Sequence, residues 1–140
     1  MISVANKLRK IANDITFNDD PVYKIKVDRL LKVCNPFSAI GIPKNLDLSN
    51  VRKQKKFKSD VSNRTKFYHL GRIKYLINLL KNNKRIDPIV IHSNNYGSVY
   101  VADGNHRIIA AYLAKNKYID AHFSGNIKLL DWLTGKIDAM

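Results

Sequence analysis

Apolar positions recur at two spacings along this chain, and the change between them marks its elements. Over residues 63–81 they lie three and four residues apart, which predicts an amphipathic helix with one face toward a core. Residues 86–91 and 98–102 are short β-rich runs on either side of a polar turn, which predicts a hairpin. A second amphipathic helix is predicted to begin at Asn105, and residues 118–123 alternate as a third strand.

The remaining segments have weaker patterns. They predict a helix at 2–15, a strand at 22–27, a loop at 37–48 and a helix at 126–135. We therefore expect an α+β fold, a small mixed sheet with flanking helices. A helical extension (1–20) would precede the main domain (21–125), and a C-terminal helix (126–140) would follow it.

Composition agrees with one domain. A chain of 140 residues, 45% of them hydrophobic, is long and apolar enough to form a proper core. No apolar run approaches the length that crosses a membrane, and the N-terminus lacks the continuous apolar segment of a signal peptide. The single cysteine, Cys34, cannot form an internal disulfide. We expect a cytoplasmic protein with no membrane partner.

The net charge of +14 is concentrated in the middle of the chain. Residues 44–85 hold thirteen Lys or Arg against two Asp, whereas residues 86–140 hold five of each sign. Such clustering favours a nucleic-acid partner, DNA in preference to RNA, over a merely solvated surface. The candidate contacts are the basic run Arg52, Lys53, Lys55, Lys56 and Lys58, and the cations off the apolar face of the 63–81 helix, Arg64, Lys66, Arg72 and Lys74.

The richest chemistry lies in the turn between the second strand of the hairpin and the second helix. A strand-to-helix turn directs unpaired backbone N–H groups and the positive end of the helix dipole at one point, which suits a phosphate. Gly104 would let the backbone approach a ligand, Arg107 would hold phosphate oxygens, and His106 would transfer a proton. Under this interpretation, removal of Arg107 would lower ligand affinity and leave stability nearly unchanged.

Two alternatives concern the same turn. Asp103 could hold Mg²⁺, although a turn or capping role is the commoner use of this residue type, and the whole turn could be structural. His69 and His92 have no partner at a ligand spacing and are interpreted as incidental.

The residues of this turn resemble a motif of the ParB/sulfiredoxin superfamily. Its partition proteins carry Gly-Glu-Arg-Arg-x-x-Ala after the strand, and Gly104, Arg107 and Ala110 match that pattern. Sulfiredoxins carry Gly-Cys-His-Arg, and free-serine kinases carry Asp-Gly-His-His-Arg; this chain differs from both at Asn105. The resemblance implies a ParB/sulfiredoxin-like fold with a phosphate or nucleotide bound by Gly104, Asn105, His106 and Arg107.

The resemblance covers residues 22–123 loosely and 85–123 closely, and the helical DNA-reading domain of partition proteins has no counterpart. Because Asn105 stands where sulfiredoxins need a thiolate, their activity is not expected. The superfamily also includes nucleotide-dependent DNA clamps, free amino-acid kinases, and small DNA-binding proteins or nucleases of plasmids and phages. Charge favours the last group, a protein that holds or cleaves the DNA backbone, with Mg²⁺ and a nucleoside triphosphate as candidate cofactors. A small-molecule phosphotransferase and a non-catalytic binder of DNA or of a host protein are the alternatives.

Overall fold

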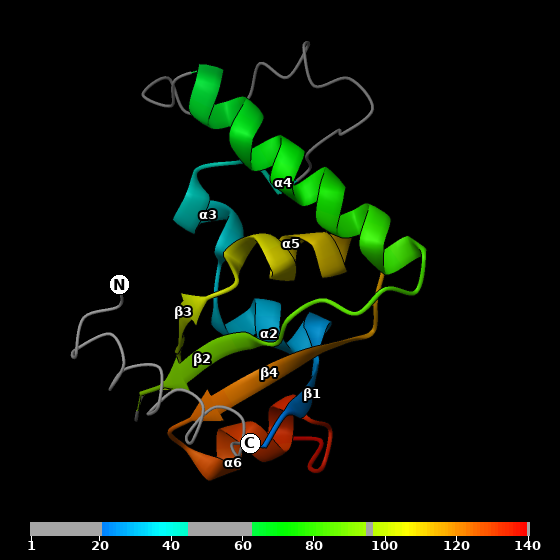
Figure 1. Ribbon diagram of the computed structural model, residues 1–140. Helices are drawn as coiled ribbons and strands as arrows, with labels where there is room; N and C mark the ends of the chain where they lie inside the picture. The colour runs from blue at the N-terminus through cyan, green and yellow to red at the C-terminus, as the bar shows by residue number, and fades with distance from the viewer. Residues whose placement is uncertain (1–20, 45–62, 95–96, 140) are drawn as a thin grey trace, which may run out of the picture.

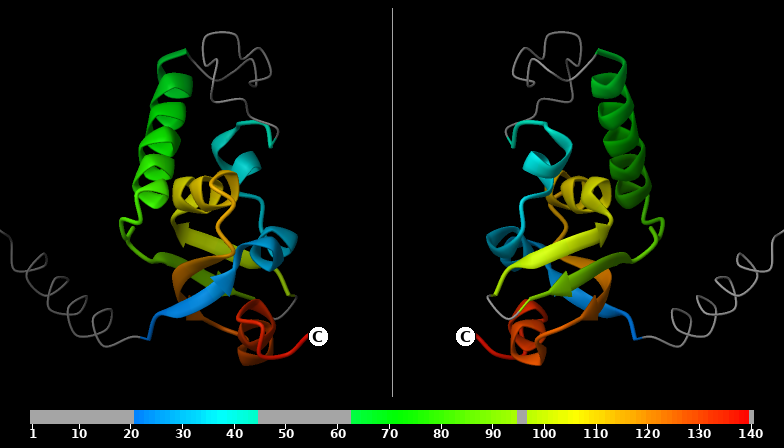
Figure 2. Two further views of the ribbon diagram at one scale, coloured as in Figure 1. Left: turned by 90° about the vertical axis from the view of Figure 1, so that its right-hand side faces the viewer. Right: turned by 90° about the vertical axis from the view of Figure 1, so that its left-hand side faces the viewer.

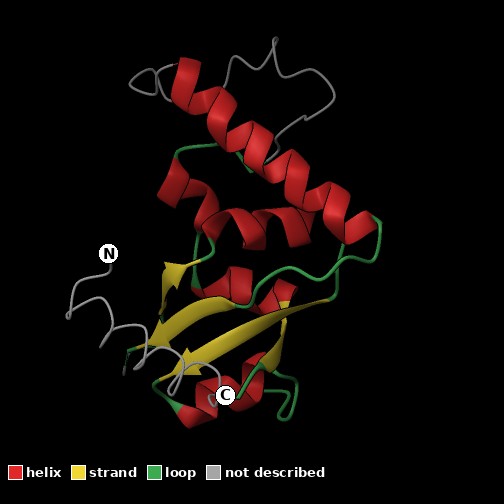
Figure 3. Cartoon of the chain, in the orientation of Figure 1, coloured by secondary structure: helices red, strands yellow, loops and turns green. Residues whose placement is uncertain are grey.

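The described part of the chain is a mixed α+β domain, as the sequence predicted. A computed structural model describes residues 21–44, 63–94 and 97–139, and of residues 63–67 the backbone alone. The strands are β1 (Tyr23–Lys26), β2 (Ile89–Ser93), β3 (Val99–Asp103) and β4 (Tyr118–Ser124). The helices are α2 (Val27–Val33), α3 (Pro36–Ile40), α4 (Asn63–Lys81), α5 (Asn105–Leu113) and α6 (Ile127–Leu133) (Figure 1 and Figure 3).

The four strands form one mixed sheet in the order β1-β4-β2-β3. The hairpin β2–β3 is antiparallel, β4 adds parallel to β2, and β1 closes the other edge antiparallel to β4. The parallel pairing requires a crossover, and α5 supplies it between β3 and β4. At the centre of the sheet Ile89 lies opposite Ala121, and both side chains are fully buried.

Helices cover the two faces of the sheet unequally. Figure 1 shows α5 over one face and α6 under the other. In the side views of Figure 2, α4 and α3 stand on opposite sides of α5, and both contact it. The layers are therefore α6, the sheet, α5, and then the pair α3 and α4.

The burial of α5 joins two hydrophobic clusters. Ile108 and Ala111 pack in the cluster built on the sheet, α2 and α6, whereas Ile109 and Ala110 pack in the cluster built on α3 and α4. Because successive helical residues point about 100° apart, four consecutive apolar residues cover most of the helix circumference. No more than 1% of any of the four is exposed.

Most predicted elements are confirmed. The helix over 63–81 has the predicted bounds, and the hairpin, the second helix, the strand from residue 118 and the C-terminal helix differ from expectation only at their ends. The first strand of the hairpin begins at Ile89 rather than at residue 86, directly after Pro88. The predicted helix at 2–15 lies outside the described residues.

Two short helices were not predicted. The segment 37–48 was expected to be a loop, but its start belongs to α3. Asn35 caps that helix by accepting a hydrogen bond from the Ser38 N–H at 3.1 Å, Pro36 occupies its first turn, and Gly41 ends it at φ 76°. Residue types that usually indicate a loop are here the start and stop signals of a five-residue helix. The other unpredicted helix, α2, follows β1 without an intervening loop.

The turn into α5 requires a glycine for two reasons. Gly104 has φ 125°, which L side chains rarely adopt. A Cβ atom there would also lie 2.4 Å from Cγ2 of Ile89 on β2. The expected role, close approach to a ligand, is thus accompanied by a structural one, the close packing of the turn on the central strand.

We predict that Gly104→Ala lowers the free energy of unfolding by at least about 2 kcal/mol, because backbone strain and overpacking add. Gly71, within α4, is the matched control, since nothing packed against that helix lies within 4 Å of the position that a Cβ would take and its backbone is helical. Gly71→Ala should therefore raise stability by roughly 0.5–1 kcal/mol. Urea denaturation of both variants measures the difference, and equal effects would contradict this role of Gly104.

Candidate functional site

The turn between β3 and α5 forms a pocket with the outer helix α4. Its volume is about 210 Å³. From α4 it is lined by Tyr68, Arg72 and Leu76, and from the turn by Asp103, Gly104, His106 and Arg107. The structure thus brings the predicted turn residues other than Asn105, and one predicted basic residue, Arg72, to a single site.

The start of α5 offers backbone donors at this site. Gly104 is the residue before the helix, and its carbonyl accepts the first intrahelical hydrogen bond, from the Ile108 N–H at 2.9 Å. The N–H groups of residues 105–107 precede that bond, and no side chain among the described residues caps the helix. Free donors and the positive end of the helix dipole favour an anion here.

Two histidines meet beside the pocket, and sequence reasoning missed one of them. Nδ1 of His69 lies 2.7 Å from Nε2 of His106. The ring centroids are 4.9 Å apart, which is close to the nitrogen–nitrogen distance plus the radii of the two rings, so the two nitrogens lie nearly on the line between the ring centres. The ring planes differ by 23°. This is an in-plane N–H···N hydrogen bond, in which one ring must be a neutral acceptor. His69 is therefore not incidental.

The environment keeps this pair neutral. The pKa of His106 is lowered mainly by burial, and further by the neighbouring charges of His69, Arg72 and Arg107. Burial also lowers the pKa of His69. At neutral pH the His106 imidazole is therefore neutral, and its Nε2 is engaged by His69.

Arg107 is held by the protein itself, more tightly than the sequence suggested. Its Nη1 donates to the carbonyl oxygens of Asp87 and Pro88 at 3.0 and 2.7 Å, and its Nη2 lies 2.7 Å from Asp103 Oδ2. Its side chain is only 14% exposed. Three of its five N–H groups are thus occupied, and two remain for a ligand. Arg107 fastens the segment before β2 to the start of α5.

Asp103 does not make a convincing magnesium site. Its carboxylate is 70% exposed and pairs with Arg107. Mg²⁺ in proteins is usually held by one or two carboxylates together with substrate phosphates. No group of three His, Cys, Asp or Glu side chains suited to a metal occurs among the described residues. The residues present give Mg²⁺ a single, already paired carboxylate.

Asn105 was predicted to bind phosphate together with the other turn residues, but it does not line this pocket. It lines a second cavity of about 330 Å³ together with Cys34, Asn35 and Tyr100. Cys34 is thus brought to the same cavity as Asn105, although the two are distant in sequence. Burial raises the pKa of the Cys34 thiol to about 11, and the thiol donates to the Leu30 carbonyl at 3.3 Å. At neutral pH it is a protonated thiol rather than a nucleophilic thiolate.

The other predicted nucleic-acid contacts are distributed unevenly. Lys74 is exposed on α4, and Arg64 and Lys66 belong to the first turns of that helix, where only the backbone is described. The basic run Arg52, Lys53, Lys55, Lys56 and Lys58 lies outside the described residues. The signal that could have identified His69 was its position next to Leu70 and Ile73 on the buried face of α4, which directs it toward α5.

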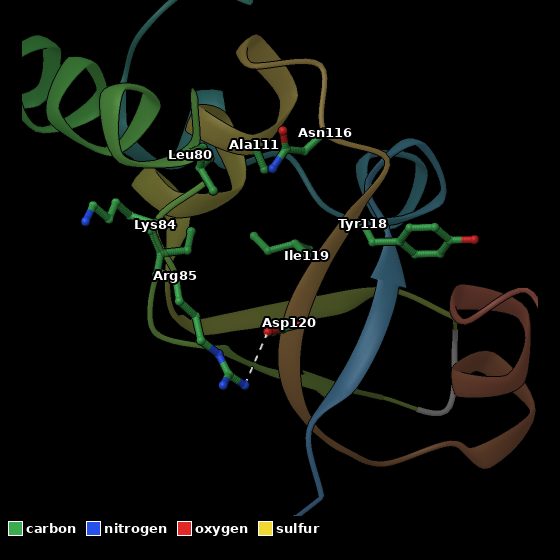
Figure 4. A pocket seen from close by; sticks show the side chains of 9 residues that line it. Leu80, Lys84, Arg85, Ala111, Asn116, Tyr118, Ile119 and Asp120 are labelled. Carbon is green, nitrogen blue, oxygen red and sulfur yellow. Dashed lines mark ion pairs between the residues drawn. The ribbon is translucent and has the colours of Figure 1, made fainter. Parts of the chain in front are cut away.

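A further cavity, of about 170 Å³, lies beside the C-terminal ends of α4 and α5 (Figure 4). Its floor is apolar, with Leu80, Ala111 and Ile119, and at its rim Arg85 pairs with Asp120 at 3.8 Å. The Arg85 side chain is 81% exposed, so this ion pair contributes little to stability.

Comparison of the chain with protein-family models, with curated proteins and with solved structures finds no match.

Arg107→Ala should lower the free energy of unfolding by about 2–3 kcal/mol, because it removes charge-assisted hydrogen bonds to two carbonyl groups. Asp103→Asn is the control, since an exposed ion-pair partner is worth less than about 1 kcal/mol. Chemical denaturation distinguishes the two. If Arg107→Ala were as stable as the parent, the structural role assigned to this arginine would be wrong.

A second prediction concerns pH. The folded state lowers the pKa of His106, so below the usual histidine pKa of about 6.5 the unfolded chain binds more protons than the folded one. The free energy of unfolding should therefore decrease as the pH falls from about 7 to about 5.5. His106→Gln should weaken this dependence, measured by urea denaturation at several pH values, whereas His92→Gln, on β2, should retain it. An unchanged slope in His106→Gln would contradict the assignment.

Proposed function

We propose that this domain binds nucleic acid, with a backbone phosphate at the start of α5. The observation that carries the proposal is the pocket in which Arg72, Arg107 and His106 surround the free N–H groups of that helix. Arg72 is exposed on α4, and no described acidic side chain pairs with it. It is therefore the side chain in this pocket most available to an anion.

The charge of the pocket favours a phosphodiester. Arg107 is compensated by Asp103, and His106 is neutral, so Arg72 and the helix dipole supply the uncompensated positive charge. A phosphodiester of a nucleic-acid backbone carries one negative charge, whereas a terminal phosphate or a triphosphate carries more. The small-molecule phosphotransferase is for this reason the weaker alternative.

The surroundings of the pocket support a polyanion. Residues 63–86 contain seven basic side chains and no Asp or Glu: Arg64, Lys66, Arg72, Lys74, Lys81, Lys84 and Arg85. A stretch of sequence with this charge attracts a phosphate backbone and gains affinity by the release of counterions. No helix among the described residues is both long and apolar enough to span a membrane. The resemblance of residues 103–107 to the ParB/sulfiredoxin motif also supports a phosphate at this turn.

Cleavage of the backbone is the second candidate function, and the histidine pair favours it. In the tautomer in which Nε2–H of His106 donates to Nδ1 of His69, Nδ1 of His106 carries a lone pair and could take a proton from an attacking water. The water oxygen would form a new P–O bond as the P–O ester bond breaks, and the leaving oxygen would take a proton from solvent. His69 would hold the ring in one orientation and share the added proton through the N–H···N contact. Binding without cleavage remains the main proposal.

Binding is tested by the salt dependence of DNA affinity. Arg72→Gln should weaken binding several-fold and reduce the slope of log K against log salt by about 0.9, the value for one lost phosphate contact. Lys128→Gln is the control, because Lys128 is exposed on α6, on the other side of the sheet. Fluorescence anisotropy with labelled DNA measures both. Equal slopes for Arg72→Gln and the parent would remove the pocket from the interface.

Cleavage is tested on the same DNA. If His106 transfers a proton, His106→Gln should abolish product formation while affinity changes less than about threefold, and His69→Gln should reduce the rate and shift its pH profile. Gel analysis with and without divalent cations provides the measurement. A parent protein that binds DNA and forms no product under any of these conditions would restrict the function to binding.

A further inference from the structure

We propose that the exposed face of α4 binds single-stranded nucleic acid by stacking unpaired bases on Tyr68 and Tyr75. The inference rests on the proposed function and specifies the form of its ligand. It depends on a stripe of four residues of α4, Tyr68, Gly71, Arg72 and Tyr75. These residues occupy positions i, i+3, i+4 and i+7 and therefore share one side of the helix.

The two tyrosines of this stripe are unusually exposed for aromatic side chains. Tyr68 is 64% and Tyr75 55% accessible. Each is nevertheless held in place from one side. The Tyr68 ring meets His69 and His106 edge-on, with centroids 5.5 and 6.2 Å apart, and the Arg72 guanidinium lies 5.9 Å from the Tyr75 centroid. Rings that are oriented by neighbours yet open to solvent are suited to stacking.

Gly71 opens the surface between the two rings. A glycine within a helix costs about 1 kcal/mol relative to alanine, and it is usually explained by close packing. Here nothing packed against α4 lies within 4 Å of the position that a Cβ would take, so packing does not require it. The absence of a side chain leaves bare helix surface beside Arg72, where the edge of a base or a sugar can approach.

The spacing of the two tyrosines in this stripe matches the spacing of bases along a nucleic-acid strand. Tyr68 and Tyr75 are seven residues apart, which places them about 10.5 Å apart along the helix axis. That distance corresponds to roughly three base steps of about 3.4 Å. Arg72 lies between them and also lines the phosphate pocket, so one strand can place a phosphate in the pocket and its neighbouring bases on the rings.

The partner is a single strand rather than a duplex or a protein. In a duplex each base is already stacked on its neighbours and has no free face for a tyrosine. An unpaired base has a free face on which a tyrosine can stack. Exposed Tyr and Arg also occur in protein interfaces, but those surfaces pair charges of both signs. The stretch 63–86 has no acidic residue, which favours a polyanion.

Fluorescence anisotropy with labelled oligothymidylate, and with a duplex of equal phosphate number, tests the proposal. The parent should prefer the single strand. Tyr68→Ala and Tyr75→Ala should each weaken single-strand binding about tenfold and leave duplex binding unchanged, whereas Tyr68→Phe and Tyr75→Phe, which keep the ring, should bind like the parent. Equal affinity of the parent for both forms, or equal losses of Phe and Ala variants, would overturn stacking.

A variant that should be at least as stable as the parent provides a sharper test. Gly71→Gln adds a neutral side chain between the rings and a better helix former, so its melting temperature should equal or exceed that of the parent while single-strand affinity falls at least several-fold. Unchanged affinity in this variant would exclude the bare surface from the interface. Oligouridylate, measured in parallel, distinguishes RNA from DNA, and binding of either strand through the tyrosines supports the proposal.

The outcomes separate this inference from the proposed function. If the parent binds duplex as well as single strand and only Arg72→Gln weakens it, nucleic-acid binding stands and stacking fails. If the parent binds neither nucleic acid, both fail together. Melting temperatures of all variants confirm that each loss of affinity occurs in a folded protein.

Discussion

The burial of the middle of α5 is the constraint on which the rest of the structure depends. Its four buried residues, 108–111, are divided between the sheet cluster and the helical cluster, so α5 joins the two. The sheet sets the position of α5 through the turn at Gly104, which packs on Ile89. Because α5 packs in both clusters and the turn before it packs on Ile89, the N–H donors at its start are held in place by the fold, and donors that are already ordered bind an anion without the entropic cost of ordering the backbone.

The second consequence concerns α4, whose inner face completes the helical cluster. Leu70, Ile73 and Leu76 are buried there, so the opposite side of the helix carries little of the folding energy. That side is free to present cations, two tyrosines and a glycine that stability alone would not select. The proposed site therefore combines a fixed part, the start of α5, with a surface whose composition the folding of the domain leaves largely open.

The sequence predicted the elements better than it predicted the contacts between them. Periodicity identified the helix over 63–81 and the strand-to-helix turn, because both patterns are local. It missed α3, whose Asn35 and Gly41 resemble loop residues until their capping roles are seen. It also missed the contact of His69 with His106, since a pairing across 37 positions depends on how two helices pack and leaves no local pattern.

Arg107 illustrates how a functional motif and a structural requirement can share residues. A cation in the first turn of a helix opposes the helix dipole and is unfavourable unless other groups compensate it. The protein compensates it instead, with the carbonyl groups of Asp87 and Pro88 and with the Asp103 carboxylate. Among the residues that line the pocket at the start of α5, the cation that no described acidic side chain pairs with is Arg72, on a different helix. A ligand at the start of α5 therefore has to bridge the two helices, and the same bridging brings it against the exposed face of α4.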